Sequence, residues 1–204
     1  MVEPAPAPTS RKGPDVTTAP SDRTEGAGRP LVVVMGVSGS GKTTVGVPLA
    51  ARLEVEYGEA DDFHPQRNID KMAAGDALDD EDREPWLQAI GRWLAERTDD
   101  GAVVTCSALA RRYRDTLRSA APEAVFLHLA VDGEVLKQRM AERQGHFMPA
   151  SLLESQLAAL EPLEPDESGL TVDADAPVDA LLDSFDRWWD DGRPTAATAA
   201  VRPS

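Results

Sequence analysis

The sequence predicts a three-layer α/β domain with helices on both faces of a mostly parallel sheet, and three observations indicate this class. Five short apolar segments have the length of strands, and stretches with helical spacing separate them. The first apolar segment also leads directly into a glycine-rich turn. Strands that alternate with helices form parallel pairs joined by helical crossovers, which leaves helices on both sides of the sheet.

The five strands are expected near 31–35, 55–60, 102–106, 124–130 and 169–173. Leu31–Met35 is apolar at every position, which is typical of a strand buried on both faces of a parallel sheet. Helices are expected near 41–53, 65–74, 80–97, 109–120, 132–143, 149–160 and 177–190. Because proline lacks a backbone donor and crowds the preceding turn, we expect Pro48 to kink the first of these helices.

The folded part of the chain is expected to be one domain that covers residues 30–191. Residues 1–29 and 192–204 consist mainly of Pro, Ala, Thr, Ser and Gly, with few large apolar side chains. Such segments bury too little apolar surface to offset the entropy cost of ordering, so we expect both to be disordered tails.

Composition restricts the function classes. The formal net charge of −15 argues against a nucleic-acid partner, because phosphate backbones are bound by clustered Lys and Arg. The apolar segments are shorter than the roughly 18 residues of a membrane span, so we expect no membrane association. Cys106 is the single cysteine, which excludes an intrachain disulfide, and the N-terminus lacks the apolar core of a signal peptide; both favour the cytoplasm.

The glycine-rich turn fits the phosphate-binding pattern G-x-x-x-x-G-K-[ST] at every fixed position and lies between a predicted strand and a predicted helix. Glycines let backbone N–H groups turn toward phosphates, and the following helix directs its positive end at them. Lys42 would reach the outer phosphates and the Thr43 hydroxyl would bind Mg²⁺. We therefore expect ATP and Mg²⁺ as cofactors and a P-loop NTPase fold. The expected nucleotide-binding residues here are Gly36, Val37, Ser38, Gly39, Ser40, Gly41, Lys42, Thr43 and Thr44.

The loop alone does not distinguish kinases from other nucleotide-binding proteins. The sequence contains neither an N-K-x-D guanine-reading motif nor an apolar run that ends in Asp-Glu, as a hydrolytic ATPase would have. Instead, Asp61 and Asp62 end the second strand, and ligands bind at the carboxyl ends of parallel strands. Asp61 could accept the proton of a substrate hydroxyl or order the water shell of a metal. The alternative is that Asp61 caps the helix expected at 65–74.

Further motifs extend over residues 31–188. They are Met35 before the loop, Asp61-Asp62-Phe63-His64-Pro65 with Asn68, Lys71-Met72 with Gly75, Leu78-Asp79-Asp80-Glu81-Asp82-Arg83 with Pro85-Trp86-Leu87, Cys106-Ser107-Ala108-Leu109 with Tyr113-Arg114-Asp115, Arg143 with His146-Phe147, and Ser155-Gln156 with Leu160-Glu161-Pro162-Leu163. With these elements the chain resembles the gluconokinases of the P-loop kinase group that also contains shikimate kinases and nucleoside monophosphate kinases. It departs from their pattern at Pro48 and at Glu59-Ala60, where the family usually has Asp-Gly.

The resemblance implies a five-stranded parallel sheet, a helical substrate-binding region and a mobile lid at about 140–152. It implies transfer of the terminal phosphoryl group of ATP to D-gluconate, which gives 6-phospho-D-gluconate; similar kinases are often homodimers. In this reading Asp61 orients and deprotonates the terminal hydroxyl of gluconate, while Lys42, Mg²⁺ and Arg143 stabilise the transferring group. The alternatives are another small-molecule kinase of the group, for shikimate or a related sugar acid, and a non-catalytic ATP-binding module.

Several matched residues have side chains suited to gluconate, a carboxylate with a row of hydroxyls. Arg83 would clamp the carboxylate, although a surface ion pair in its acidic surroundings is the alternative. His64, Asn68 and Lys71 are spaced i, i+4 and i+7 and would line the pocket from one helix face, or else form a solvated polar face. Ser107 follows the third strand and would bind substrate hydroxyls.

The expected lid contributes two arginines. Arg143 precedes His146-Phe147 and is assigned a catalytic role, and Arg139 lies four residues earlier, on the same helix face, as a nucleotide contact. Cys106 and His128 are interpreted as buried packing residues rather than as reactive groups.

Overall fold

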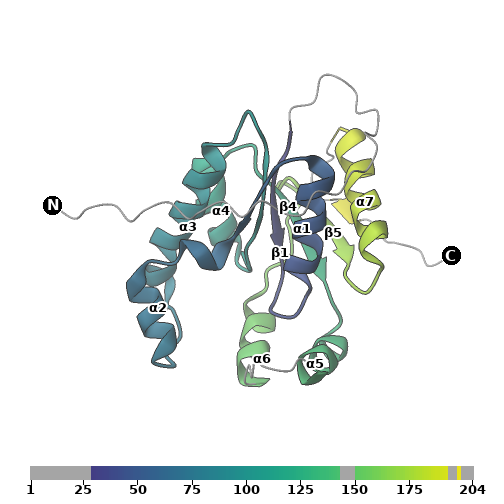
Figure 1. The fold of residues 1–204 in the computed structure, drawn as a ribbon. Coiled ribbons are helices and arrows are strands. Elements are labelled where there is room, and N and C mark those ends of the chain that lie inside the picture. Colours follow the sequence, from purple (N-terminus) through teal and green to yellow (C-terminus); the bar gives the residue numbers. More distant parts are fainter. Residues whose placement is uncertain (1–28, 143–149, 193–196, 199–204) are drawn as a thin grey trace.

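The computed structural model describes residues 29–142, 150–192 and 197–198 (Figure 1). Its middle layer is a parallel six-stranded sheet in the order β2-β3-β1-β4-β5-β6. The strands are β1 (Leu31–Met35), β2 (Glu56–Glu59), β3 (Ala102–Thr105), β4 (Val125–Ala130), β5 (Gly169–Asp173) and β6 (Ala197–Thr198). The five predicted strands are confirmed. The sequence analysis did not predict β6, a two-residue strand within the segment 192–204 that was expected to be a tail.

The centre of the sheet is β1, whose five residues are all buried. Val33 of β1 is in register with Val104 of β3 on one side and with Phe126 of β4 on the other. After β1 the chain crosses to β2, and after β3 it crosses past β1 to β4 on the opposite side. The carboxyl ends of β1 and β3 therefore flank the position where the strand order reverses, which is where open α/β sheets bind ligands.

Helices cover both faces of the sheet, as predicted (Figure 1). On one face α1 (Lys42–Leu53) and α7 (Val178–Asp190) pack against alternate strand residues such as Val34. On the other face α3 (Asp80–Ala95) and α4 (Arg111–Ala120) pack against the intervening residues such as Val33. The alternation follows from the two-residue period of a strand, which directs successive side chains to opposite faces. Pro48 lies inside α1, and the helix continues past it to Leu53.

The remaining helices are gathered around the carboxyl ends of the strands, at the bottom of Figure 1. They are the 3₁₀ helix η1 (Ala60–Phe63), α2 (Gln66–Ala73), α5 (Gly133–Glu142) and α6 (Ala150–Ala159). Residues 143–149, which make up most of the predicted lid, lie outside the described residues. Within the described ranges, none of the helices is long and apolar enough to cross a membrane.

Candidate active site

The glycine-rich loop joins β1 to α1 at the carboxyl end of the sheet. Gly36, Gly39 and Gly41 have φ values of 146°, 80° and 92°, a region that L-residues other than glycine rarely adopt. A Cβ on Gly36 would lie 2.8 Å from Ser40 Oγ and 2.9 Å from the Leu129 carbonyl oxygen. The glycines are therefore required by the backbone, and α1 begins at Lys42 directly behind the loop, which directs its N-terminal N–H groups toward the loop.

Two polar groups of the loop are suited to a phosphate ligand. The hydroxyl Oγ of Ser40 is buried and has no hydrogen-bond partner within the part of the chain that the structure describes. Lys42 Nζ donates to the carbonyl of Val37 at 3.1 Å, so the ammonium group folds back over the loop. The Ser40 hydroxyl and the Lys42 ammonium lie beside the N-terminus of α1, whose N–H groups carry partial positive charge. This combination fits a polyphosphate.

Two contacts from distant segments support the loop. Gly36 N donates to the carbonyl of Ser107, which follows β3, at 3.3 Å. Ser38 N donates to the side-chain oxygen Oε1 of Gln156, on α6, at 2.7 Å. Ser107 was predicted to bind substrate through its hydroxyl, and its backbone also holds the loop. Gln156 stands in one of the matched motifs, but the sequence assigned it no role.

A carboxylate that the sequence analysis did not select, Glu59 at the end of β2, accepts three hydroxyl hydrogen bonds. Thr43 Oγ1 donates to it at 3.2 Å, the Tyr57 hydroxyl at 2.6 Å, and Thr105 Oγ1 at 2.5 Å. Burial and the bond to Glu59 raise the pKa of the Tyr57 phenol. The departure at Glu59-Ala60 thus keeps a carboxylate in contact with the predicted metal ligand Thr43, and its position at the end of a strand was the signal available in the sequence.

The oxygen atoms of Thr43 and Glu59 form a site that fits Mg²⁺. This ion prefers oxygen ligands and is usually held by one or two protein groups together with phosphate oxygens and water. Among the described residues there is no group of three or more His, Cys, Asp or Glu that could hold a metal by itself. Thr43 with Glu59 nearby therefore matches a metal that arrives with the nucleotide.

Asp61 lies in η1, directly after β2, and is exposed. The turn that carries it is anchored by Trp86, whose Nε1 donates to the Ala60 carbonyl at 2.7 Å. The N-cap of α2 is Pro65, with no side-chain capping bond, so Asp61 does not cap that helix and the structural alternative for it is excluded. The charge of Asp61 acts on the pKa of both His64 and Cys106, although burial is the largest cause of the shift at each.

His64 is fixed by an aromatic ring and an amide. Its imidazole stacks on Trp86, with centroids 4.4 Å apart and planes 11° apart. The buried Asn68 donates from Nδ2 to the Asp82 carbonyl at 2.8 Å, and the same nitrogen lies 3.4 Å from His64 Nδ1. Because an amide nitrogen only donates, Nδ1 is the acceptor and the proton of the neutral ring is on Nε2. Burial lowers the pKa of His64, which favours that neutral form.

The two cations predicted to bind gluconate both have acidic partners. Lys71 Nζ contacts Asp79 at 3.0 Å and also Asp82, the two residues that form the capping box of α3. Arg83 Nη1 lies 3.2 Å from the Tyr113 hydroxyl and 3.6 Å from Asp80.

His64 and Asn68 contact each other, but His64 precedes α2, which begins at Gln66, so the predicted single helix face does not include it. Lys71 binds the start of α3. Thr44 is exposed in the first turn of α1. Arg139 belongs to α5, and its side chain is outside what the structure describes. Arg143 is outside the described residues altogether.

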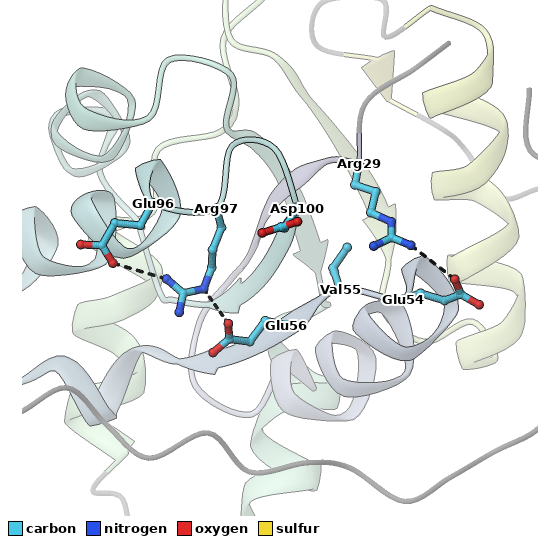
Figure 2. A pocket seen from close by; sticks show the side chains of 8 residues that line it. Arg29, Glu54, Val55, Glu56, Glu96, Arg97 and Asp100 are labelled. Carbon is cyan, nitrogen blue, oxygen red and sulfur yellow. Dashed lines mark hydrogen bonds and ion pairs between the residues drawn. The ribbon is translucent and has the colours of Figure 1, made fainter. Parts of the chain in front are cut away.

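The cavity of about 430 Å³ drawn in Figure 2 lies at the opposite, amino ends of β2 and β3. Its arginines are paired: Arg97 lies 2.8 Å from Glu56 and 3.6 Å from Glu96, and Arg29 lies 3.5 Å from Glu54 (Figure 2). This cavity is remote from the phosphate loop and does not belong to the candidate active site.

The parallel sheet, the glycine loop against α1 and the carboxylates Glu59 and Asp61 at the end of β2 define a P-loop kinase. The family described as AAA domain matches residues 31–163. A gluconokinase from Gluconobacter oxydans is 46% identical over 77% of this chain and 89% of its own length. The chain belongs to the gluconokinase family.

Two solved structures agree with this assignment. An unliganded sugar kinase from Janibacter sp. is 50% identical, covers 82% of this chain and 98% of its own, and has a TM-score of 0.73. A gluconokinase from Sinorhizobium meliloti is 42% identical, covers 80% of this chain and 98% of its own, and has a TM-score of 0.68.

Proposed function

We propose that this chain is a gluconokinase, which transfers the terminal phosphoryl group of ATP to D-gluconate and forms 6-phospho-D-gluconate. The single observation that carries the proposal is the complete phosphate loop beside a strand-end acid, Asp61, in a chain with gluconokinase relatives. The substrate hydroxyl would be the acceptor, so the product is a phosphate ester and ADP leaves.

The loop would bind the nucleotide through backbone N–H groups of the loop and of the N-terminus of α1. Lys42 would exchange its bond with the Val37 carbonyl for a bond with the outer phosphates, and the unpartnered Ser40 hydroxyl would donate to a phosphate oxygen. Thr43 would hold Mg²⁺, with Glu59 in contact with the Thr43 hydroxyl; when bound, this ion neutralises charge on the phosphate oxygens.

Gluconate would bind between η1, α2 and the segment after β3. Asp61 is exposed at the carboxyl end of β2, where it can accept a hydrogen bond from the attacking hydroxyl and then its proton. His64, held by Asn68 and Trp86, would present its Nε2–H as a donor to a hydroxyl of the sugar acid. Ser107 would supply a further hydroxyl contact.

The carboxylate of gluconate would be bound by Arg83. The Arg83 guanidinium has five N–H donors. Among the described residues, its hydrogen bond to Tyr113 and its ion pair with Asp80 both involve Nη1, so Nε and Nη2 would be available for a bidentate contact. Lys71 adds positive charge nearby, but its two aspartates must be displaced or shared before it binds substrate directly.

Arg139 and Arg143 would close over the phosphates as part of a lid at about 140–152 and exclude water that would otherwise hydrolyse ATP. We further propose that the enzyme acts in the cytoplasm, without a nucleic-acid or membrane partner, and forms a homodimer. The charge of −15 and the presence of a single cysteine support the first part, and light scattering at several concentrations tests the dimer.

The test is ADP formation, measured by a coupled assay, with ATP and gluconate, shikimate or related sugar acids. Gluconate should give the highest kcat/KM, and Lys42→Ala should abolish turnover with every acceptor. Asp61→Asn should lower kcat by roughly 10²–10⁴-fold, the usual contribution of a general base. Asp62→Asn, next to it and also exposed, is the matched control and should keep near-normal turnover.

Near-normal activity of a folded Asp61→Asn variant would remove the role assigned to Asp61. A preference for shikimate would correct the substrate. ATP binding without any product would indicate a non-catalytic module.

A further inference from the structure

Among the residues that the structure describes, one ion pair is completely buried: Arg114 on α4 and Glu167 before β5 each have 0% of the side chain exposed. It is bidentate, with Nε to Oε1 at 2.6 Å and Nη2 to Oε2 at 2.8 Å. Burial by itself would raise the pKa of Glu167, but the bonds from Arg114 outweigh it and the net pKa is lowered. The lowered pKa favours the ionised form of Glu167 beside the guanidinium.

The remaining donors of Arg114 bind backbone carbonyls of two separate segments. Nη1 lies 3.2 Å from the Ala108 carbonyl oxygen, 3.1 Å from that of Leu109 and 3.1 Å from that of Glu161. Nη2 lies 3.2 Å from the Pro162 carbonyl oxygen. One guanidinium thus joins the segment after β3 to the segment after α6, which are more than 50 residues apart in the sequence.

Both segments lie next to residues that accept hydrogen bonds from the phosphate loop. Ser107, next to Ala108, accepts the hydrogen bond from Gly36 N. Gln156 accepts the bond from Ser38 N, and its helix α6 ends at Ala159, two residues before Glu161. Ala108 has a φ of 43°, a strained value for a residue with a Cβ, so the segment after β3 needs outside support to keep its shape.

We propose that the Arg114–Glu167 pair is a positioning element for phosphoryl transfer, which holds the two segments that support the phosphate loop without touching substrate. The proposal rests on the kinase function proposed above. Stability alone is a weak reason for such a pair, because well-packed apolar residues of similar volume often replace buried ion pairs without loss of stability. Displacement of reacting groups by about 1 Å, in contrast, can cost on the order of 10²-fold in rate.

The deciding experiment compares two double variants. Arg114→Met with Glu167→Leu removes the buried pair and its carbonyl contacts but keeps the volume. Arg111→Met with Asp166→Leu removes a neighbouring bidentate pair, at 2.7 and 2.5 Å, that joins the same two parts of the chain at the surface. Thermal unfolding, kcat, and the KM values for ATP and gluconate are measured for both variants and for the wild type.

We expect the buried double variant to stay folded, to keep both KM values within about threefold and to lose at least tenfold in kcat, since placement of the reacting groups affects turnover more than binding. The surface variant should keep wild-type kcat. A folded buried variant with wild-type kcat overturns the proposal.

If the buried double variant does not fold, Glu167→Gln decides, because it keeps the shape and removes the charge: a several-fold loss of kcat at wild-type KM supports positioning, and an unchanged kcat refutes it. Failure of the wild type itself to form ADP with gluconate would instead refute the proposed function.

Discussion

Substitution of alanine for Gly36 tests whether the backbone of the phosphate loop is the nucleotide site. Gly36 has a φ of 146°, and its added Cβ would lie 2.9 Å from the Leu129 carbonyl oxygen and 2.8 Å from Ser40 Oγ. The Ser40 side chain can rotate away from the new Cβ. The Leu129 carbonyl cannot move in this way, because it belongs to the buried strand β4. Loop and strand must therefore separate by about 0.5 Å to reach ordinary van der Waals contact.

Two terms add to the cost of Gly36→Ala. Backbone strain at a φ that only glycine adopts easily costs roughly 1–3 kcal/mol. Overpacking against a fixed group costs roughly 1–3 kcal/mol more, so we expect about 3 kcal/mol or more of lost stability in total. Part of this strain can be relieved by turning the loop, which would misdirect its amides, so the affinity for ATP should fall at least tenfold.

Gly75→Ala is the matched control. Gly75 lies between α2 and α3 with a φ of 88°, and a Cβ there would meet no atom within 4 Å. Gly75→Ala shares the backbone penalty of roughly 1–3 kcal/mol but not the clash. Urea unfolding gives the two stability changes, and calorimetric titration with ATP gives the two affinities.

If Gly36→Ala bound ATP as tightly as Gly75→Ala did, the loop backbone would not be the phosphate site. If the two variants lost equal stability, the clash with β4 would be absent.

Two further predictions concern buried titratable groups. Burial lowers the pKa of His128 to about 4, so the unfolded chain takes up its proton first; stability should fall by about 3 kcal/mol as the pH drops from about 6.5 to 4. His128→Gln should remove that part of the pH dependence, and parallel curves for the two proteins would contradict the assignment. Burial raises the pKa of the Cys106 thiol to about 12, so the native protein should not react with iodoacetamide at pH 8, whereas the urea-unfolded chain should react at this single thiol. Rapid labelling of the native protein would refute that view of Cys106.

The sequence predicted the parts of the site that depend on nearby residues. The run Leu31–Met35 marked a buried strand, and the fixed glycines behind it marked a loop with positive φ, because both properties are set within a few residues. The sequence correctly grouped His64 with Asn68, which contact each other, but His64 precedes α2 and therefore does not lie on a face of that helix. The end of the second strand correctly marked the position of Asp61.

The partners of these groups could not be predicted in the same way. Lys71 of α2 is engaged by the start of α3, and Arg83 of α3 by a tyrosine on α4, because the fold packs α4 against α3 and brings the start of α3 to α2. In the sequence Glu59 is only a departure from the family pattern, and the packing of β2 beside α1 places its carboxylate against Thr43.

The sequence by itself determined the fold class, the phosphate loop and the acid after the second strand, since periodicity, glycine positions and strand ends are local properties of the chain. Only the tertiary structure decided that Gln156 supports Ser38, 118 residues away, and that Arg114 binds Glu167, 53 residues away. The strand order β2-β3-β1-β4-β5-β6 brings the ends of distant segments to one edge of the sheet. Where these segments meet, the hydrogen bond between Ser38 and Gln156 and the ion pair between Arg114 and Glu167 can form, and the low dielectric of buried surroundings strengthens such interactions.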